Sequence, residues 1–115
     1  MTIKIRVSQI NHCAYCLDMH WKDARALGES EQRLYGLSAW EESPYYSDRE
    51  RAALAWAEAV TACKISDQIY DLVSATFSEQ ELVDLTVVIY TINTWNRINV
   101  SFPHGIGTYK VGQFG

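Results

Sequence analysis

Two cysteines and a histidine lie close together near the start of the chain, at Cys13, Cys16 and His20. A two-residue spacer lets Cys13 and Cys16 close a small disulfide ring within one helical turn. In a helix, His20 lies one turn beyond Cys16 on the same face, where its imidazole can take the proton of a thiol. The spacing therefore predicts a redox-active dithiol. One thiol attacks an oxidant and is oxidised, and the other then forms a disulfide with it, so that Cys13, Cys16 and His20 make up the catalytic group.

The same side chains leave two other interpretations open. A zinc ion would draw its ligands from Cys13, Cys16, His20 and either His12 or His104, although no second CxxC pair is present. Alternatively, both cysteines pack as small buried apolar residues. Haem attachment requires a histidine where Leu17 stands, and an iron–sulfur cluster requires more thiolates than three cysteines supply. We expect a redox site that holds neither a metal nor a cofactor.

A helix must hold these groups in place, and Asn11 and Gly28 predict where it begins and ends. Asparagine is a frequent N-cap and glycine a frequent C′ residue, so we expect a helix over residues 12–27. Both sulfurs then lie in its first turns, where the helix dipole and free backbone N–H groups favour a thiolate. Because only Cys16 also has His20 one turn away, we expect Cys16 to be the more acidic thiol.

Serine residues predict four further helices, because a serine side chain accepts a hydrogen bond from a free N–H group of the first turn. Two of these serines belong to capping boxes, in which the carboxylate of a glutamate three residues later accepts a hydrogen bond from the backbone N–H of the serine. The expected helices run from Ser30 to about residue 40, from Ser47 to about residue 62, from Ser66 to about residue 77 and from Ser78 to about residue 99.

For the last of these helices, the spacing of apolar residues and the intrinsic preferences of the residues disagree. Residues 86–92 are rich in β-branched side chains, which favour strands, but leucine and isoleucine recur at helical spacing over residues 82–92. The helix is apolar nearly all round, so we expect part of its surface to lie in a subunit interface. Its polar residues are expected to bond across that interface or to line a cavity near the dithiol; they are Asn93, Asn96, Arg97 and Asn99.

The length predicts one domain over residues 1–115. The caps and the helical spacing predict that it is all-α, with five or six helices and a loose glycine-rich tail at about 101–115. A net charge of −4 without a basic cluster argues against nucleic-acid or anionic-membrane partners. No apolar run is long enough for a membrane span, and the first residues do not form a secretory signal. We therefore expect a cytoplasmic protein, in a compartment that keeps thiols reduced.

The segment from Arg6 to Glu29 resembles the signature of alkylhydroperoxidase D-like proteins within the carboxymuconolactone decarboxylase family. The CxxC-x3-H motif stands with its flanking residues, and the resemblance continues in order at Leu37–Trp40, 47–61, Phe77–Leu85 and Ile92–Arg97. It implies an all-helical obligate homo-oligomer, as a trimer, a dimer-based assembly or a hexamer. It also implies a thiol-dependent peroxidase or disulfide oxidoreductase for antioxidant defence, with a hydroperoxide substrate and a lipoyl- or thioredoxin-type reductant.

By position in this resemblance, Cys16 corresponds to the thiol that attacks peroxide, Cys13 to its resolving partner and His20 to a relay histidine. Two positions differ from the family pattern. The position of the family's relay glutamate is occupied by Met1, and a histidine that some relatives carry before the second cysteine is Tyr15. We expect redox activity to be retained despite these differences.

Two other functions are consistent with parts of the sequence. A lyase acting on a small carboxylate, like the decarboxylase branch of the family, would use His20 as a general acid–base and leave the cysteines incidental. A zinc-stabilised assembling protein would have no catalytic role. Cys63 has no partner nearby in the sequence, and we expect a buried or idle thiol there.

Overall fold

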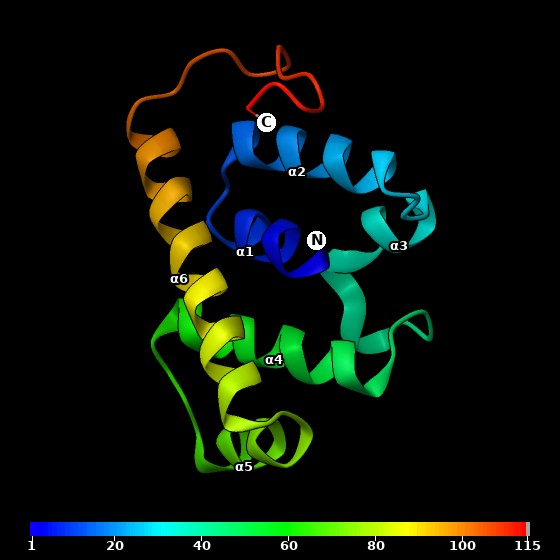
Figure 1. Cartoon of the computed structure of the whole chain (residues 1–115), viewed down its shortest axis with the longest axis vertical. Coiled ribbons are helices and arrows are strands. Elements are labelled where there is room, and N and C mark those ends of the chain that lie inside the picture. The colour runs from blue at the N-terminus through cyan, green and yellow to red at the C-terminus, as the bar shows by residue number, and fades with distance from the viewer. Residues whose placement is uncertain (115) are drawn as a thin grey trace.

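The computed structural model describes residues 1–114, which form six α-helices and one 3₁₀ helix and contain no strand. In chain order these are α1 (Thr2–Ile10), α2 (Ala14–Ala26), α3 (Glu31–Tyr35), the 3₁₀ helix η1 (Leu37–Glu42), α4 (Asp48–Ala62), α5 (Asp67–Thr76) and α6 (Glu79–Ser101). The all-α class predicted from the sequence is confirmed. Helix α1 lies near the centre and contacts α2, α4 and α6 (Figure 1).

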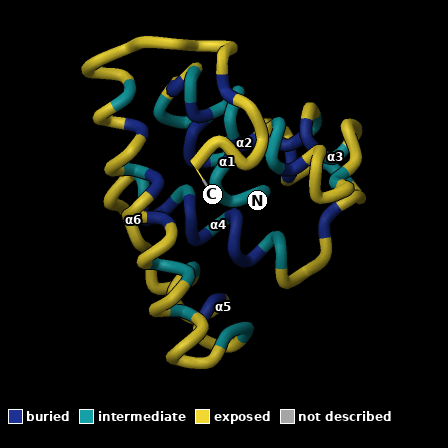
Figure 2. Tube along the Cα trace, turned by 45° about the horizontal axis from the view of Figure 1, so that its top comes forward, coloured by how far each residue is buried: buried dark blue, intermediate teal, exposed yellow. Residues whose placement is uncertain are grey.

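Helix α1 separates two clusters of buried apolar side chains. Ile5 packs into one cluster together with residues of α2, α3, η1 and α4, and Val7 packs into the other with residues of α4, α5 and α6. Full burial of one such side chain stabilises the fold by roughly 1.5–3 kcal/mol. The buried stretches accordingly follow α1 and the inner face of α4, while α5 and much of α6 face outward (Figure 2).

The predicted serine caps are present at the start of α3, α4, α5 and α6. Each serine side chain accepts a bond from the backbone N–H three residues later, and both capping boxes are complete. Helix α6 forms despite its β-branched residues because Ile89 and Ile92 are buried in the second cluster. Here tertiary packing outweighs a weak local preference. Among residues 1–114, no helix is both long enough and apolar enough to span a membrane.

The turn between α1 and α2 differs from the predicted one. Asn11 is the C-cap of α1, and α2 begins at Ala14 with Cys13 as its N-cap. His12 has a left-handed φ of 54°; its N–H donates to Gln9 O (3.2 Å), and the N–H of Cys13 donates to Ser8 O (3.0 Å). These two bonds form a Schellman motif, which usually places glycine where His12 stands.

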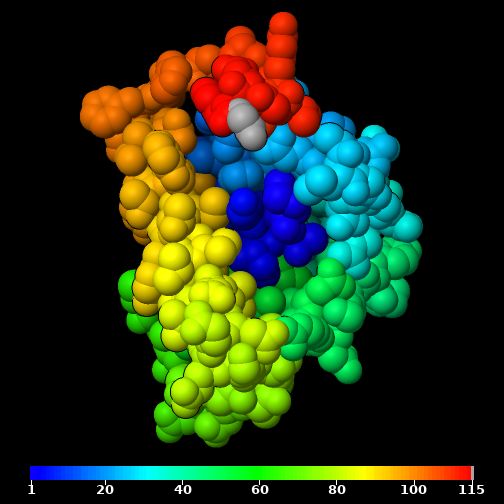
Figure 3. Space-filling model, viewed as in Figure 1, coloured from blue at the N-terminus to red at the C-terminus, as the bar shows by residue number. Residues whose placement is uncertain are grey.

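The segment that follows α6 lies against α2 (Figure 3). Tyr109 is buried, and its hydroxyl donates to Asp23 Oδ1 (2.7 Å). The ammonium of Lys22 donates to the carbonyl oxygens of Gly107 and Tyr109, at 3.3 and 3.1 Å. These contacts attach the glycine-rich end of the chain to the helix that follows the first cysteine.

The left-handed residue in the turn gives a stability prediction. His12→Val introduces a β-branched side chain at φ 54° and should lower the free energy of unfolding by about 1–2 kcal/mol. His12→Gly should stay within about 1 kcal/mol of the original, because relief of strain offsets the greater freedom of the unfolded chain. Urea unfolding at a fixed protein concentration measures both variants.

His104→Val is the matched control, because His104 is also an exposed histidine but lacks a left-handed φ. Equal stability of the valine and glycine variants at position 12 would show that the backbone of this turn does not constrain the side chain.

Candidate active site

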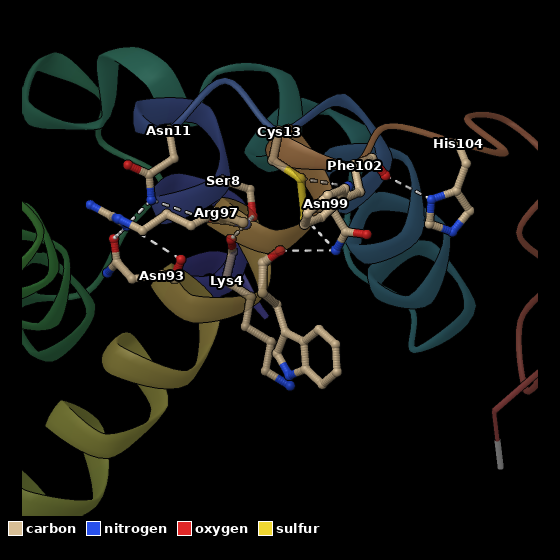
Figure 4. The surroundings of a disulfide bond; sticks show 12 residues. Lys4, Ser8, Asn11, Cys13, Asn93, Arg97, Asn99, Phe102 and His104 are labelled. Carbon is tan, nitrogen blue, oxygen red and sulfur yellow. Dashed lines mark hydrogen bonds between the residues drawn. A yellow bond between two sulfur atoms is a disulfide. The ribbon is translucent and has the colours of Figure 1, made fainter.

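Cys13 and Cys16 are joined by a disulfide, with their Cα atoms 5.3 Å apart (Figure 4). Each residue is 1% exposed. Cys13 is held from both sides: its N–H donates to Ser8 O (3.0 Å) and its carbonyl accepts from Leu17 N–H (2.9 Å). The pair therefore lies at the junction of α1 and α2, with its backbone fixed by both helices.

The sulfur of Cys13 takes the place of a capping oxygen at the start of α2. The N–H of Cys16 donates to Cys13 Sγ at 3.3 Å, as a free N–H of a first turn donates to an N-cap side chain. Helix N-termini stabilise negative charge, so this position favours a thiolate on Cys13. From the sequence both sulfurs were expected inside the first turns of the helix, whereas Cys13 precedes the first turn as its N-cap and accepts this hydrogen bond.

The sulfur of Cys16 has a donor from a different helix. Asn99 of α6 donates from Nδ2 to Cys16 Sγ at 3.7 Å. The same Nδ2 atom also donates to Trp95 O (2.9 Å), one turn earlier in α6. Asn99 was expected either at a subunit boundary or near the dithiol, and the structure places it beside the dithiol.

Asn93, Asn96 and Asn99 are spaced three residues apart on α6 and form an asparagine row. Asn11, in the turn before the cysteines, donates from Nδ2 to Oδ1 of Asn93 (2.8 Å) and Oδ1 of Asn96 (3.0 Å). Asn96 donates in turn to Ser8 Oγ (3.0 Å). All three have hydrogen-bond partners in their own chain, and bonds from these groups across a subunit boundary stay a prediction.

His20 lies one turn after Cys16 in α2 and is 6% exposed. Burial, followed by the nearby positive charge of Lys4, lowers the pKa of His20 from 6.5 to about 4. Within the part of the chain that the structure describes, His20 Nδ1 is buried and has no hydrogen-bond partner. At neutral pH the imidazole is therefore uncharged, with a ring nitrogen that is free to bond with a reacting group.

The other residues considered in the sequence lie outside this arrangement. Met1, at the family's relay-glutamate position, packs against the first apolar cluster. Tyr15 is half-buried and stacks on His104, with ring centroids 5.9 Å apart. Cys63 is exposed and has a left-handed φ of 56° at the end of α4. Of the two expected alternatives, a buried thiol is therefore wrong, and an idle thiol stays a prediction. In residues 1–114, no group of three or more His, Cys, Asp or Glu side chains is arranged to hold a metal ion.

The low pKa of His20 predicts how stability depends on pH. The unfolded chain takes up a proton on this imidazole near pH 6.5, whereas the folded chain does so only near pH 4. The contribution of His20 to the free energy of unfolding is therefore intact above pH 6.5. It is lost as the pH falls toward 4, which lowers the free energy of unfolding by up to about 3 kcal/mol. Unfolding between pH 7 and 4.5, together with NMR titration of the imidazole, measures the effect.

His20→Asn should flatten this pH dependence, whereas substitution of the exposed His104 by asparagine should leave it unchanged. An imidazole of His20 that titrates near 6.5 in the folded protein contradicts the prediction.

Comparison with known proteins shows what this chain is related to. The model of the carboxymuconolactone decarboxylase family matches residues 2–59. The uncharacterized protein YdfG of Bacillus subtilis (strain 168) is 48% identical over 102 residues, which cover 86% of this chain and 69% of YdfG. The uncharacterized protein YnjA of Escherichia coli (strain K12) is 35% identical over 100 residues, which cover 84% of this chain and 54% of YnjA.

A crystal structure of a protein of unknown function from Agrobacterium tumefaciens, described as a candidate antioxidant defence protein AhpD, superimposes with a TM-score of 0.88. It is 46% identical, and the match covers 94% of this chain and 76% of that one. Together with the family match over residues 2–59, this agreement in sequence and fold means that the chain belongs to the carboxymuconolactone decarboxylase family, with an AhpD-like fold.

Proposed function

We propose that this protein is a thiol-dependent peroxidase, which reduces hydroperoxides through Cys13 and Cys16 and serves antioxidant defence in the cytoplasm. One observation carries the proposal: each sulfur of the bonded pair accepts a hydrogen bond, and the neutral, buried His20 follows one turn later. Hydrogen bonds to a sulfur favour its thiolate, which is the form that attacks a peroxide. The antioxidant description of the Agrobacterium tumefaciens protein agrees with it.

In the oxidative half of the reaction, Cys16 attacks. The Cys16 thiolate forms a bond to one peroxide oxygen while the O–O bond breaks, and an alcohol leaves with the proton that the thiol had given up. The sulfenic acid on Cys16 is then attacked by Cys13, the S–O bond breaks and water leaves. The dithiol loses two electrons, which reduce the hydroperoxide to alcohol and water.

In the reductive half, a dithiol of the lipoyl or thioredoxin class restores the pair. The hydrogen bond from Cys16 N–H to Cys13 Sγ makes Cys13 the better leaving group, because it stabilises the departing thiolate. We therefore propose that the reductant attacks Cys16 and releases Cys13. The second thiol of the reductant then breaks the mixed disulfide and leaves as a cyclic or protein disulfide.

His20 takes up the proton of the Cys16 thiol and returns it to the leaving alcohol. Its buried Nδ1 has no partner among the described residues, and burial keeps the ring neutral at physiological pH. A negative sulfur one turn away raises the proton affinity of the imidazole, so transfer becomes favourable as the thiolate forms. His20 thus functions as a relay without a permanent positive charge.

We also propose that the protein is a homo-oligomer that associates through the outer face of α6. Val83, Val87 and Tyr90 are 57%, 54% and 57% exposed on this helix. With Trp56 and Tyr70 they line a cavity of about 460 Å³ between α5 and α6. A continuous apolar face of this kind is typical of a subunit contact.

The peroxidase proposal predicts different results for the two cysteines. Cys16→Ser should abolish peroxide consumption, because no attacking sulfur remains. Cys13→Ser should react once and stop as a sulfenic acid on Cys16 that a dimedone-type reagent traps. His20→Ala should slow the reaction most near neutral pH and least at alkaline pH, where the thiol ionises without help.

Mass spectrometry of the peroxide-treated chain provides the control for this prediction. A loss of about 2 Da confined to the peptide that carries Cys13 and Cys16 supports the proposal, and Cys63→Ser should leave it unchanged. Linkage to Cys63, or turnover of a small carboxylate by a variant without Cys13 and Cys16, contradicts it.

The oligomer proposal predicts a sedimentation result. The wild-type chain should sediment at micromolar concentration as a species heavier than 13.1 kDa. Val83→Glu combined with Val87→Glu should shift it toward the monomer, because association would bury two carboxylates. Leu27→Glu is the matched control, since Leu27 is also exposed but lies outside α6. Sedimentation of the wild-type chain as a monomer would contradict the proposal.

A further inference from the structure

Asn99 is the polar side chain that joins α6 to the sulfur of Cys16, although the two residues are far apart in the chain (Figure 4). A primary amide nitrogen carries two hydrogens. One of them reaches Trp95 O at 2.9 Å, within α6 itself. The other is directed at Cys16 Sγ, at 3.7 Å.

The bond to Trp95 determines which way the amide faces. If the amide were reversed, its oxygen would lie against the carbonyl oxygen of Trp95 and one bond within α6 would be lost. The nitrogen therefore stays on this side, and its second hydrogen remains available to Cys16. The donor is in place before the disulfide is reduced.

We propose that Asn99 is a catalytic residue, which donates to the Cys16 thiolate and thereby makes Cys16 the attacking sulfur; this rests on the function proposed above. The N-cap geometry by itself favours a thiolate on Cys13, through the N–H of Cys16. A hydrogen bond to the charged form of Cys16 favours that form as well. The backbone of α2 stabilises a thiolate on Cys13 only, and Asn99 of α6 provides the corresponding N–H donor for a thiolate on Cys16.

Asn99 differs in its contacts from the rest of the asparagine row. Asn93 and Asn96 accept from Asn11, and they donate to Thr61 and Ser8 respectively, so both tie α6 to other elements of the fold. The bonds of Asn99 go to its own helix and to Cys16. Substitution at Asn99 should therefore change the chemistry of the sulfur more than the stability of the fold.

The other charged or titratable groups around the pair come from every neighbouring element. Figure 4 labels Lys4 of α1, Arg97 of α6 and His104 of the C-terminal segment. His20 follows Cys16 one turn later in α2. None of them is altered by substitution at Asn99. A change in Cys16 reactivity in such a variant is therefore attributable to the amide.

The test is alkylation of the reduced full-length chain by iodoacetamide as a function of pH, with each cysteine followed by peptide mass spectrometry. Asn99→Leu keeps the size of the side chain and removes the donor. It should raise the pKa of Cys16 by about one unit and lower peroxide reactivity near neutral pH about tenfold. The alkylation profile of Cys13 should be unchanged.

Asn99→Asp is the second variant, because a carboxylate of the same shape beside the sulfur disfavours the thiolate further. It should raise the pKa of Cys16 at least as much as the leucine variant does. Thr94→Val is the matched control: it keeps the shape of an exposed polar side chain of the same helix, removes a hydroxyl that donates to Tyr90 O within α6, and should leave the Cys16 profile unchanged.

Unchanged Cys16 profiles in both Asn99 variants, or equal shifts in the Thr94→Val control, would overturn this assignment. The alkylation profile requires no peroxide turnover, so the two proposals can fail separately. A wild-type chain that consumes no peroxide rejects the proposed function, whereas the profile still decides whether Asn99 stabilises the Cys16 thiolate.

Discussion

Cys13 ends one helix and begins the next, and the geometry of the candidate active site depends on this double role. Its N–H closes the Schellman motif of α1 on Ser8, while its sulfur caps α2 by accepting from Cys16 N–H. Two helix ends normally need separate partners for their free backbone groups. Here one residue satisfies both, so the sulfur is positioned by two helices and the link between them is only three residues long.

The two sulfurs consequently lie in different electrostatic environments. Cys13 is stabilised by α2 itself, whereas Cys16 receives its donor from α6, through Asn99. Burial keeps His20 uncharged at neutral pH, so this imidazole is not a permanent cation beside either sulfur. A site built in this way relies on neutral N–H donors, which stabilise a negative sulfur and also allow a buried disulfide.

Helix α6 carries both the support of the site and a surface without a partner in the chain. Its asparagine row is bonded to the α1–α2 turn, which is necessary because buried amides without partners are strongly unfavourable. Its opposite side exposes Val83, Val87 and Tyr90. An assembly through that side would hold α6 in place and, through Asn99, would support Cys16.

The sequence by itself determined the helical class, the serine caps of α3 to α6 and the segment that carries the dithiol, because these depend on local spacing and on first-turn hydrogen bonds. It misplaced the start of α2, since Asn11 suits an N-cap and His12 gives no sign of a left-handed residue. It also could not assign Asn99 to Cys16, although the repeat of asparagine every three residues marked a polar face on α6. Only the tertiary structure decided which groups meet that face and how deeply His20 is buried, because both depend on how α1, α2 and α6 pack together rather than on neighbours along the chain.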